Sequence, residues 1–387
     1  MSKIVKSIVI TGNGTNCEVE MAHACCLAGA DVVYIVHISE LLAGEKRLDD
    51  YDFLNLPGGF LDGDDLGAAK AGANRIRHAA IAGTEEKLYD QMTRFIRDGK
   101  LILGVCNGFQ LLVKLGLLPG CDGDYQTQTA TLTHNDSGRF EDRWVHLAAN
   151  PSSPCIFTRG LTHLYLPVRH GEGKFIPRDE DIRARLHREG HVVLQYGTPP
   201  GETANSVFAG EAYISDAAAG RIRGTSDIAV GASNAGLANA GTASNNNHVT
   251  GTAGKVITST GGAASGGFNP SRVGAASYES TAAAAAPASP FAPIGANNAG
   301  STAFAAASNN FAPGASSPTM SYPENPNGSV DAIAGICNAT GRIFGLMPHP
   351  EAFLHRVNHP RWTREDLPDA GQGLALFQNA VAFLRDN

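Results

Sequence analysis

The sequence predicts an α/β protein with a mostly parallel central sheet covered by helices on both faces, in three layers. Two observations carry this prediction. Up to about Tyr196, short β-rich runs alternate with helical patterns, which is typical of βαβ units. Strand patterns also stand on both sides of a long polar stretch, at residues 191–196 before it and from residue 332 after it, so we expect one domain with a long insertion.

The elements of the first half follow one another closely along the chain. We expect strands at residues 7–10, 32–36, 51–56 and 101–105. We expect helices at residues 18–27, 85–97 and 107–115. In such folds, ligands bind beyond the carboxyl ends of the strands, so the residues that follow each strand are the first candidates for a site.

A low-complexity segment covers about residues 198–317. It consists largely of Ala, Gly, Ser, Asn and Thr, and between Gly231 and Met320 its only charged residues are Lys255, Arg272 and Glu279. With so few large apolar side chains, burial returns too little free energy to order it, so we expect a disordered or loosely packed insertion in a surface loop. A small repetitive β-structure is the alternative.

Ordered sequence resumes near Tyr322. Residues 332–336 and 342–347 predict two strands that meet at a turn at residues 338–341, and residues 373–384 predict an amphipathic closing helix. The expected organisation is therefore a domain built from residues 1–197 and 318–387, with residues 198–317 inserted between them.

The most informative segment is LILGVCNGFQLL, residues 101–112. Gly104 and Gly108 flank Cys106 in a G-x-C-x-G pattern, the thiol counterpart of the nucleophile elbow between a strand and a helix. The positive end of the following helix would favour the thiolate. A free cysteine is more commonly a small buried apolar residue, but the two glycines and the strand-helix context favour a nucleophile here.

A cysteine nucleophile needs a partner that takes and returns a proton, and a third residue that orients that partner. The segment GLMPHPEAF, residues 345–353, follows an expected strand and offers His349 and Glu351. Pro348 and Pro350 should hold the backbone extended, so that His349 and Glu351 project to a similar side. The alternative is an ordinary loop histidine, one of 13 in the chain.

Acyl transfer also needs donors aimed at the developing oxyanion. The segment LPGGF, residues 56–60, ends an expected strand with Gly58 and Gly59, whose backbone amides could serve together with the amide of Asn107. An ordinary tight turn is the alternative for the two glycines.

Composition excludes several classes of protein and site. The 43% hydrophobic content suffices for a core. No apolar run is long enough to span a bilayer, and the N-terminal segment does not have the pattern of a secretory signal. We therefore expect a cytoplasmic protein with no membrane partner. A dispersed net charge of −7 argues against nucleic acid as a partner. No metal site is expected, because the seven cysteines include no C-x-x-C pair. Six of them are expected to be reduced structural thiols, namely Cys17, Cys25, Cys26, Cys121, Cys155 and Cys337.

The motifs LPGGF, GVCNGFQLL and MPHPE, in this order, resemble the class I glutamine amidotransferases. That resemblance implies a flavodoxin-like three-layer fold and a Cys-His-Glu triad that hydrolyses glutamine to glutamate and ammonia. The segments at residues 133–144, 169–175 and 325–338 are similar to those of a subgroup, the glutaminase subunits of phosphoribosylformylglycinamidine synthases in purine biosynthesis. The resemblance covers residues 1–197 and about 318–387, and the insertion departs from it.

By this resemblance, Cys106 is the nucleophile, His349 the general acid and base, and Glu351 its orienting residue. The resemblance also implies that Gly58, Gly59 and Asn107 supply the oxyanion hole. It places Gln110 and the loop at His170 near bound glutamine. His134 and Arg139 are candidates for substrate or partner contacts, with a polar surface loop as the equally weighted alternative.

The resemblance also implies a complex. Ammonia would pass to a synthetase subunit that amidates formylglycinamide ribonucleotide, and a small accessory subunit is a further candidate partner. The chain has no G-x-x-x-x-G-K-[ST] loop, so ATP and Mg are expected on the synthetase, with no cofactor bound by this chain. The alternatives are a related elbow cysteine hydrolase that acts on another amide, and a non-enzymatic scaffold in which the insertion is the working part.

Overall fold

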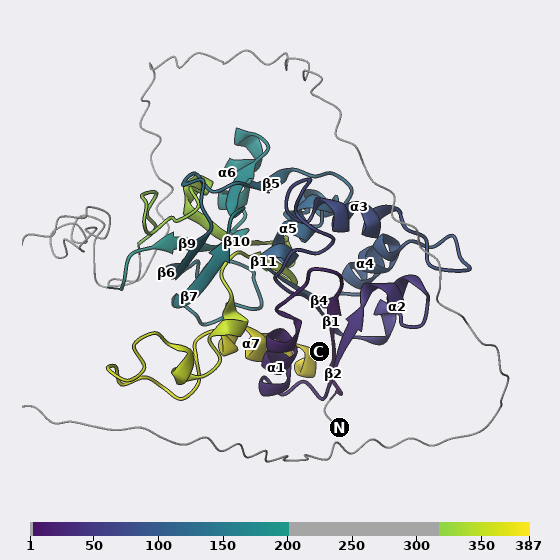
Figure 1. The fold of residues 1–387 in the computed structure, drawn as a ribbon, viewed down its shortest axis with the longest axis horizontal. Coiled ribbons are helices and arrows are strands. Elements are labelled where there is room, and N and C mark those ends of the chain that lie inside the picture. Colours follow the sequence, from purple (N-terminus) through teal and green to yellow (C-terminus); the bar gives the residue numbers. More distant parts are fainter. Residues whose placement is uncertain (1–2, 201–316) are drawn as a thin grey trace, which may run out of the picture. The chain divides into compact units, whose positions relative to one another are not determined.

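The computed structural model describes residues 3–200 and 317–387, to which all structural statements below refer (Figure 1). These residues build a nine-stranded sheet in the order β2-β1-β3-β4-β11-β10-β9-β6-β7. The strands are β1 (Lys6–Thr11), β2 (Val32–His37), β3 (Phe53–Leu56), β4 (Leu101–Val105), β6 (Glu141–Ala149), β7 (His163–His170), β9 (Val192–Gly197), β10 (Ile333–Cys337) and β11 (Ile343–Leu346). A separate two-stranded sheet pairs β5 (Ala130–Thr133) with β8 (Lys174–Pro177).

The large sheet has a parallel and an antiparallel half. Strands β2, β1, β3, β4 and β11 run parallel to one another. Strands β10, β9, β6 and β7 continue the sheet with antiparallel pairs, and β10 and β11 form the predicted hairpin. The α/β prediction is confirmed, and the parallel half is the half that carries the predicted site.

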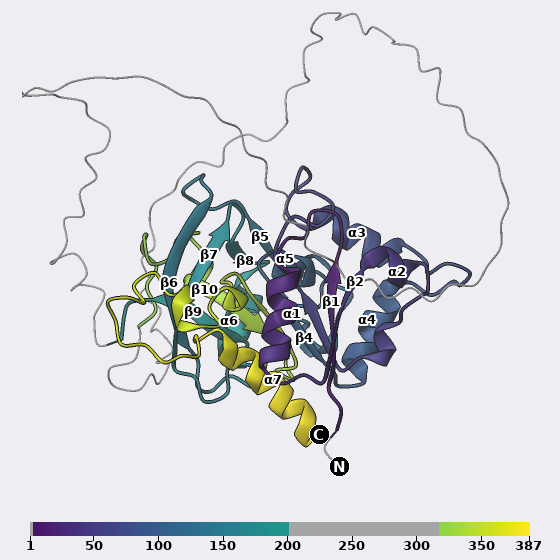
Figure 2. The same cartoon turned by 60° about the horizontal axis from the view of Figure 1, so that its bottom comes forward.

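Helices cover both faces of the parallel half (Figures 1 and 2). On one face α1 (Glu18–Leu27) packs beside α7 (Leu374–Asp386), and on the other α3 (Lys70–His78) packs with α4 (Leu88–Arg97) and α5 (Asn107–Lys114). The helices α2 (Ile38–Leu42) and α6 (Glu180–Arg188) complete the set, and short 3-10 helices span Leu48–Asp50, Cys121–Gly123, Val330–Ala332, Pro350–Ala352 and Arg356–Asn358.

The core lies between these helices and the sheet. Every residue of β3, β4 and β11 is buried, as expected for strands covered on both faces. Phe157 bridges two of these strands, because its ring contacts both Phe53 and Phe344. Helix α4 turns Leu88, Met92 and Phe95 inward, at the spacing of one helix face.

The predicted elements agree with the structure apart from some of their ends. The helix expected at residues 18–27 and the strand at 101–105 have the predicted bounds. The helix expected from residue 85 begins only at Leu88, because Lys87 is extended and its N–H donates to the Asp90 side chain in a cap. The strand expected from Tyr51 begins at Phe53, since Tyr51 closes a 3-10 turn.

The two described segments are joined where the predicted insertion leaves the sheet. The N–H of Thr198 donates to the carbonyl of Ser317 at 3.1 Å, and the N–H of Thr319 donates to that of Tyr196 at 3.0 Å. Residues 201–316, nearly all of the predicted insertion, lie outside the described residues, so the domain boundaries stay a prediction. In the part of the chain that is described, no helix combines the length and apolar character needed to cross a membrane.

Candidate active site

The predicted site residues follow adjacent parallel strands. Leu56 of β3 pairs with Gly104 of β4, and Val105 of β4 pairs with Leu346 of β11. The glycine turn, Cys106 and His349 therefore leave the sheet at the same edge, beyond the carboxyl ends of three neighbouring strands. This is the place where open α/β sheets hold their ligands.

Cys106 lies at a strained turn between β4 and α5. Its φ is 50° and its ψ is −104°, which a residue with a side chain rarely adopts. Its N–H donates to the carbonyl of Leu346 at 2.8 Å, which fixes the turn to β11. The side chain is only 6% exposed, and its Sγ lies 3.7 Å from the carbonyl oxygen of Arg169.

The flanking glycines permit this turn by close approach. A Cβ on Gly108 would lie 1.9 Å from the carbonyl oxygen of Leu56, and one on Gly104 would lie 2.7 Å from that of Gly108. Side chains at either position would push α5 away from the sheet. The elbow geometry expected from the G-x-C-x-G pattern is therefore present.

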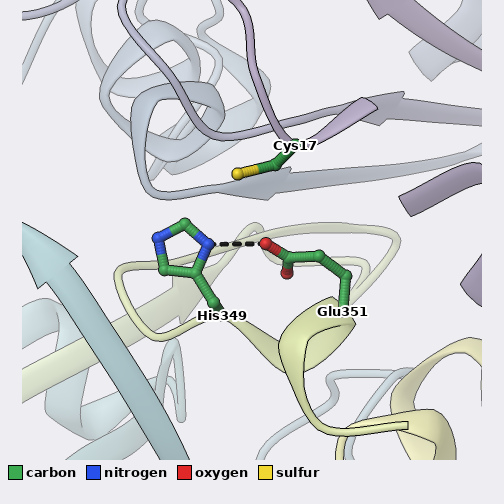
Figure 3. A group of neighbouring side chains, drawn as sticks. All are labelled: Cys17, His349 and Glu351. Carbon is green, nitrogen blue, oxygen red and sulfur yellow. Dashed lines mark hydrogen bonds and ion pairs between the residues drawn. The ribbon is translucent and has the colours of Figure 1, made fainter. Parts of the chain in front are cut away.

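His349 and Glu351 form a buried pair (Figure 3). Nδ1 of His349 and Oε1 of Glu351 are 2.5 Å apart, and the N–H of His349 donates to the carbonyl of Pro167 at 2.8 Å. The expectation of an extended backbone holds for His349 but is wrong after it, because Pro350 starts a 3-10 helix. That turn brings Glu351 back to the imidazole.

Cys106 and His349 meet beside Gly58. A Cβ on Gly58 would lie 2.8 Å from Cε1 of His349 and 3.5 Å from Cβ of Cys106, so only glycine leaves room for both side chains. Cys106 and His349 also line one cavity of about 130 Å³, together with Gly59, Gln110 and His170. The predicted nucleophile and its proton-transfer partner thus share a chamber, although they are far apart along the chain.

The two buried histidines of this cavity carry opposite pKa shifts. Burial alone would lower the pKa of His349, but the charges of Glu351 and Cys106 outweigh it and raise this pKa well above 6.5. For His170, burial and the neighbouring His349 lower the pKa to about 3. At neutral pH, His349 is therefore the histidine of this cavity that holds a proton to donate.

The residues predicted for the oxyanion hole lie at the glycine turn and the start of α5, and Gln110, predicted to contact glutamine, lies further along that helix. Gly59 has a φ of 135°, and Gly58 accepts a hydrogen bond from the N–H of Asn16 at 3.3 Å. The side chain of Asn107 accepts from the N–H of Leu61 at 3.1 Å, so it ties the glycine turn to α5. Gln110 lines the cavity and donates to the carbonyl of Glu172.

The two residues predicted for substrate or partner contacts, His134 and Arg139, do not line the cavity of Cys106. The side chain of His134 is 81% exposed, 3.8 Å from Glu172, and lines a neighbouring cavity of about 890 Å³. Arg139 is exposed, and its carbonyl accepts from the side chain of Asn135 at 2.8 Å. Glu172 borders both cavities, so it separates His134 from the nucleophile.

The sequence analysis missed several residues of the cavity. Arg169 and Glu172 lie within residues 169–175, and Phe140 lies within residues 133–144. Both segments contributed to the family resemblance, so they could have pointed to these residues. The residues next to Asp64 and Cys17 in the sequence form no pattern that would predict either of them as a site residue. The structural role expected for Cys17 is incomplete, because this residue also lines the catalytic cavity. The full set missed is Asn16, Cys17, Phe60, Asp64, Phe140, Arg169, Gly171 and Glu172.

A family model for CobB/CobQ-like glutamine amidotransferase domains matches residues 4–209 and 296–384. The chain belongs to this family. It is 34% identical over 385 residues to the phosphoribosylformylglycinamidine synthase subunit PurQ of Dehalococcoides mccartyi, with 100% of this chain and 99% of that protein covered. The PurQ subunit of Methanococcus maripaludis is 31% identical over 394 residues, with 99% of each covered.

The glutamine amidotransferase fold is also found among solved structures. A chain in the structure of PurLQS from Thermotoga maritima matches with a TM-score of 0.50 and 20% identity, covering 99% of this chain and 100% of that one. The chain therefore shares its fold with a chain of that solved structure.

Proposed function

We propose that this chain is the glutaminase subunit of phosphoribosylformylglycinamidine synthase, and that Cys106, His349 and Glu351 are its catalytic triad. The observation that carries the proposal is that the elbow thiol of Cys106 shares one small cavity with His349, whose imidazole is paired with the buried Glu351. The full-length similarity to PurQ subunits gives the reaction in which the ammonia is used.

The reaction proceeds in two steps. The thiolate of Cys106 attacks the side-chain amide carbon of glutamine, the oxyanion forms beside the amides of the glycine turn and Asn107, and the imidazolium of His349 protonates the departing ammonia. A thioester remains on Cys106. His349 then takes a proton from water, which attacks the thioester, and glutamate leaves as the thiol is restored. Glu351 holds the imidazole in position throughout.

The cavity suits a small charged amide. Asp64 and Glu172 border it and supply negative charge that suits the α-ammonium group of glutamine. The pKa of Asp64 is raised, mainly by burial. A bound cation would therefore stabilise the ionised form of this carboxylate. Gln110 and the loop of His170 lie where the glutamine side chain enters.

The partner is a synthetase subunit that holds ATP and Mg. Phe60 and Phe140 border the cavity, yet 46% and 56% of their surfaces are exposed, which suits a site that a partner covers. A covering subunit would shield ammonia from water on its way out. We assign the complex to the cytoplasm, where ATP and glutamine are both available.

The triad is tested by ammonia release from glutamine with the chain in complex with its synthetase. Cys106→Ala should lower the rate about a thousandfold or more, since the nucleophile has no substitute. Cys26→Ala is the matched control, because this thiol is exposed on α1, and it should keep the parent rate. Ammonia release by Cys106→Ala at the parent rate would exclude the mechanism.

A further inference from the structure

A second thiol lies close to the catalytic pair. Cys17 lies in the loop between β1 and α1, and ligand atoms of Cys17, His349 and Glu351 all lie within 4.8 Å of one another. Figure 3 shows the Cys17 sulfur above the hydrogen bond that joins the other two residues. The triad explains only two members of this cluster.

The three donors have the chemistry that Zn²⁺ prefers. Thiolate, imidazole and carboxylate are its usual protein ligands, and three of them leave a fourth position for water. Ligand atoms around a tetrahedral zinc ion lie about 3.4–3.6 Å apart, from bond lengths of about 2.0–2.3 Å. The sulfur must therefore approach by about 1 Å, and the His349–Glu351 contact must open by a similar amount.

Burial and access also favour a cation here. The Oε2 atom of Glu351 is buried and has no hydrogen-bond partner among the described residues. Cys17 is half-buried, lines the catalytic cavity, and donates from its thiol to the side-chain oxygen of Asn16 at 3.3 Å. A small ion can thus reach the cluster through the cavity that glutamine uses.

We propose that Cys17, His349 and Glu351 form an inhibitory site for Zn²⁺ and similar thiophilic divalent cations. The ion displaces the Cys17 thiol proton and the proton between Nδ1 of His349 and Oε1 of Glu351, and both protons leave to solvent. The ion takes the place of the Glu351 hydrogen bond at Nδ1, so Glu351 no longer holds the imidazole of His349 in position for proton transfer at Nε2. The effect on activity rests on the proposed glutaminase function, whereas metal binding does not.

Metal binding is tested with Co²⁺ as the probe, by the ultraviolet thiolate-to-cobalt absorption of the full chain. The parent and Cys106→Ala should both show the band, and Cys26→Ala controls for the exposed thiol and should keep it. Cys17→Ser should lose it. A band that survives in Cys17→Ser but disappears in Cys106→Ala would place the metal on the nucleophile and overturn the proposal, as would no band in the parent.

Inhibition is tested separately by ammonia release under Zn²⁺ titration, with each variant compared to its own zinc-free rate. The parent should lose activity and regain it when a chelator is added. Cys17→Ser should need at least about tenfold more Zn²⁺, because it lacks one of three ligands. Equal zinc sensitivity of Cys17→Ser and the parent would overturn the inhibitory role. If no variant releases ammonia, the proposed function fails, and the Co²⁺ result still decides the metal site.

Discussion

At the scale of single residues, the site depends on one strained backbone conformation and one buried ion pair. The positive φ of Cys106 costs about 1–3 kcal/mol, which the surrounding contacts must offset. The hydrogen bond from the N–H of Cys106 to Leu346 and the close packing at Gly108 hold the turn in place. The thiol is therefore presented by the fold and does not depend on ligand binding for its position.

The carboxylate of Glu351 should set the alkaline limit of activity. His349 must be protonated to release ammonia, and its raised pKa keeps it so at neutral pH; activity is lost as pH rises through that pKa. Glu351→Gln removes a charge that raises the pKa, so the alkaline limb of kcat/KM should move about 1–3 pH units lower. Glu365→Gln, a carboxylate beside His359, is the control. An unmoved alkaline limb in Glu351→Gln would contradict this account.

The residues of the site differ in how well the sequence predicts them. The glycines around Cys106 and the short spacing of His349 and Glu351 are local patterns, so the triad could be predicted. Cys17 could not, because it reaches the cluster from a loop whose position depends on the pairing of β1 with β3 and on hydrogen bonds to the glycine turn. Its role depends on contacts between distant segments, which no local pattern records.

At the scale of elements, the close packing of α5 on β3 controls the elbow. Gly108→Ala places a Cβ against the backbone carbonyl of Leu56, which cannot rotate away. We expect a loss of about 1–3 kcal/mol in the free energy of unfolding, together with a loss of ammonia release as Cys106 moves.

Urea denaturation and the glutaminase rate test the packing of α5. Gly160→Ala is the comparison, since nothing lies within 4 Å of its Cβ and only its φ of 75° opposes a side chain, at about 1–2 kcal/mol. It should keep full activity. A Gly108→Ala protein that releases ammonia at the parent rate would show that the elbow does not require this close approach.

Burial explains which elements the sequence predicts. The continuous apolar run of β4 is recognisable because all of its residues are buried. Strands β6 and β7 were missed because they alternate irregularly between buried and exposed positions, with charged residues in β6 and Pro167 within β7. Helix α6 is mostly charged, and its signal is the Asp179 cap, whose side chain accepts from the N–H of Ile182. The two outer strands of the antiparallel half thus gave weaker sequence patterns than β9 and β10, whose residues are all buried.

At the scale of the whole molecule, two chain segments share one sheet. Strand β10, from the second segment, pairs with β9 from the first, and β11 pairs with β4. The side chain of Asp331 also accepts two hydrogen bonds from Arg183 of α6, at 2.6 and 2.7 Å. The site needs both segments, because one supplies Cys106 and the other His349.

The catalytic reaction should not need residues 201–316. Their flanks are already adjacent, with Thr198 and Ser317 joined by a hydrogen bond of 3.1 Å, so a short Gly-Ser linker can replace these residues at little closure cost. The shortened chain should unfold cooperatively and release ammonia within about threefold of the parent rate. Cys106→Ala in the same background is the control. A folded but inactive shortened chain would show that the segment takes part in the reaction.

The central claim is that the thiol of Cys106 attacks glutamine in the cavity that it shares with His349. The most direct measurement is covalent labelling with a glutamine analogue that carries a diazoketone in place of the side-chain amide, followed by mass-spectrometric mapping of the adduct. The account predicts one adduct, on Cys106, that excess glutamine prevents. An adduct on Cys17 instead, or labelling of Cys106 that glutamine does not slow, would contradict it.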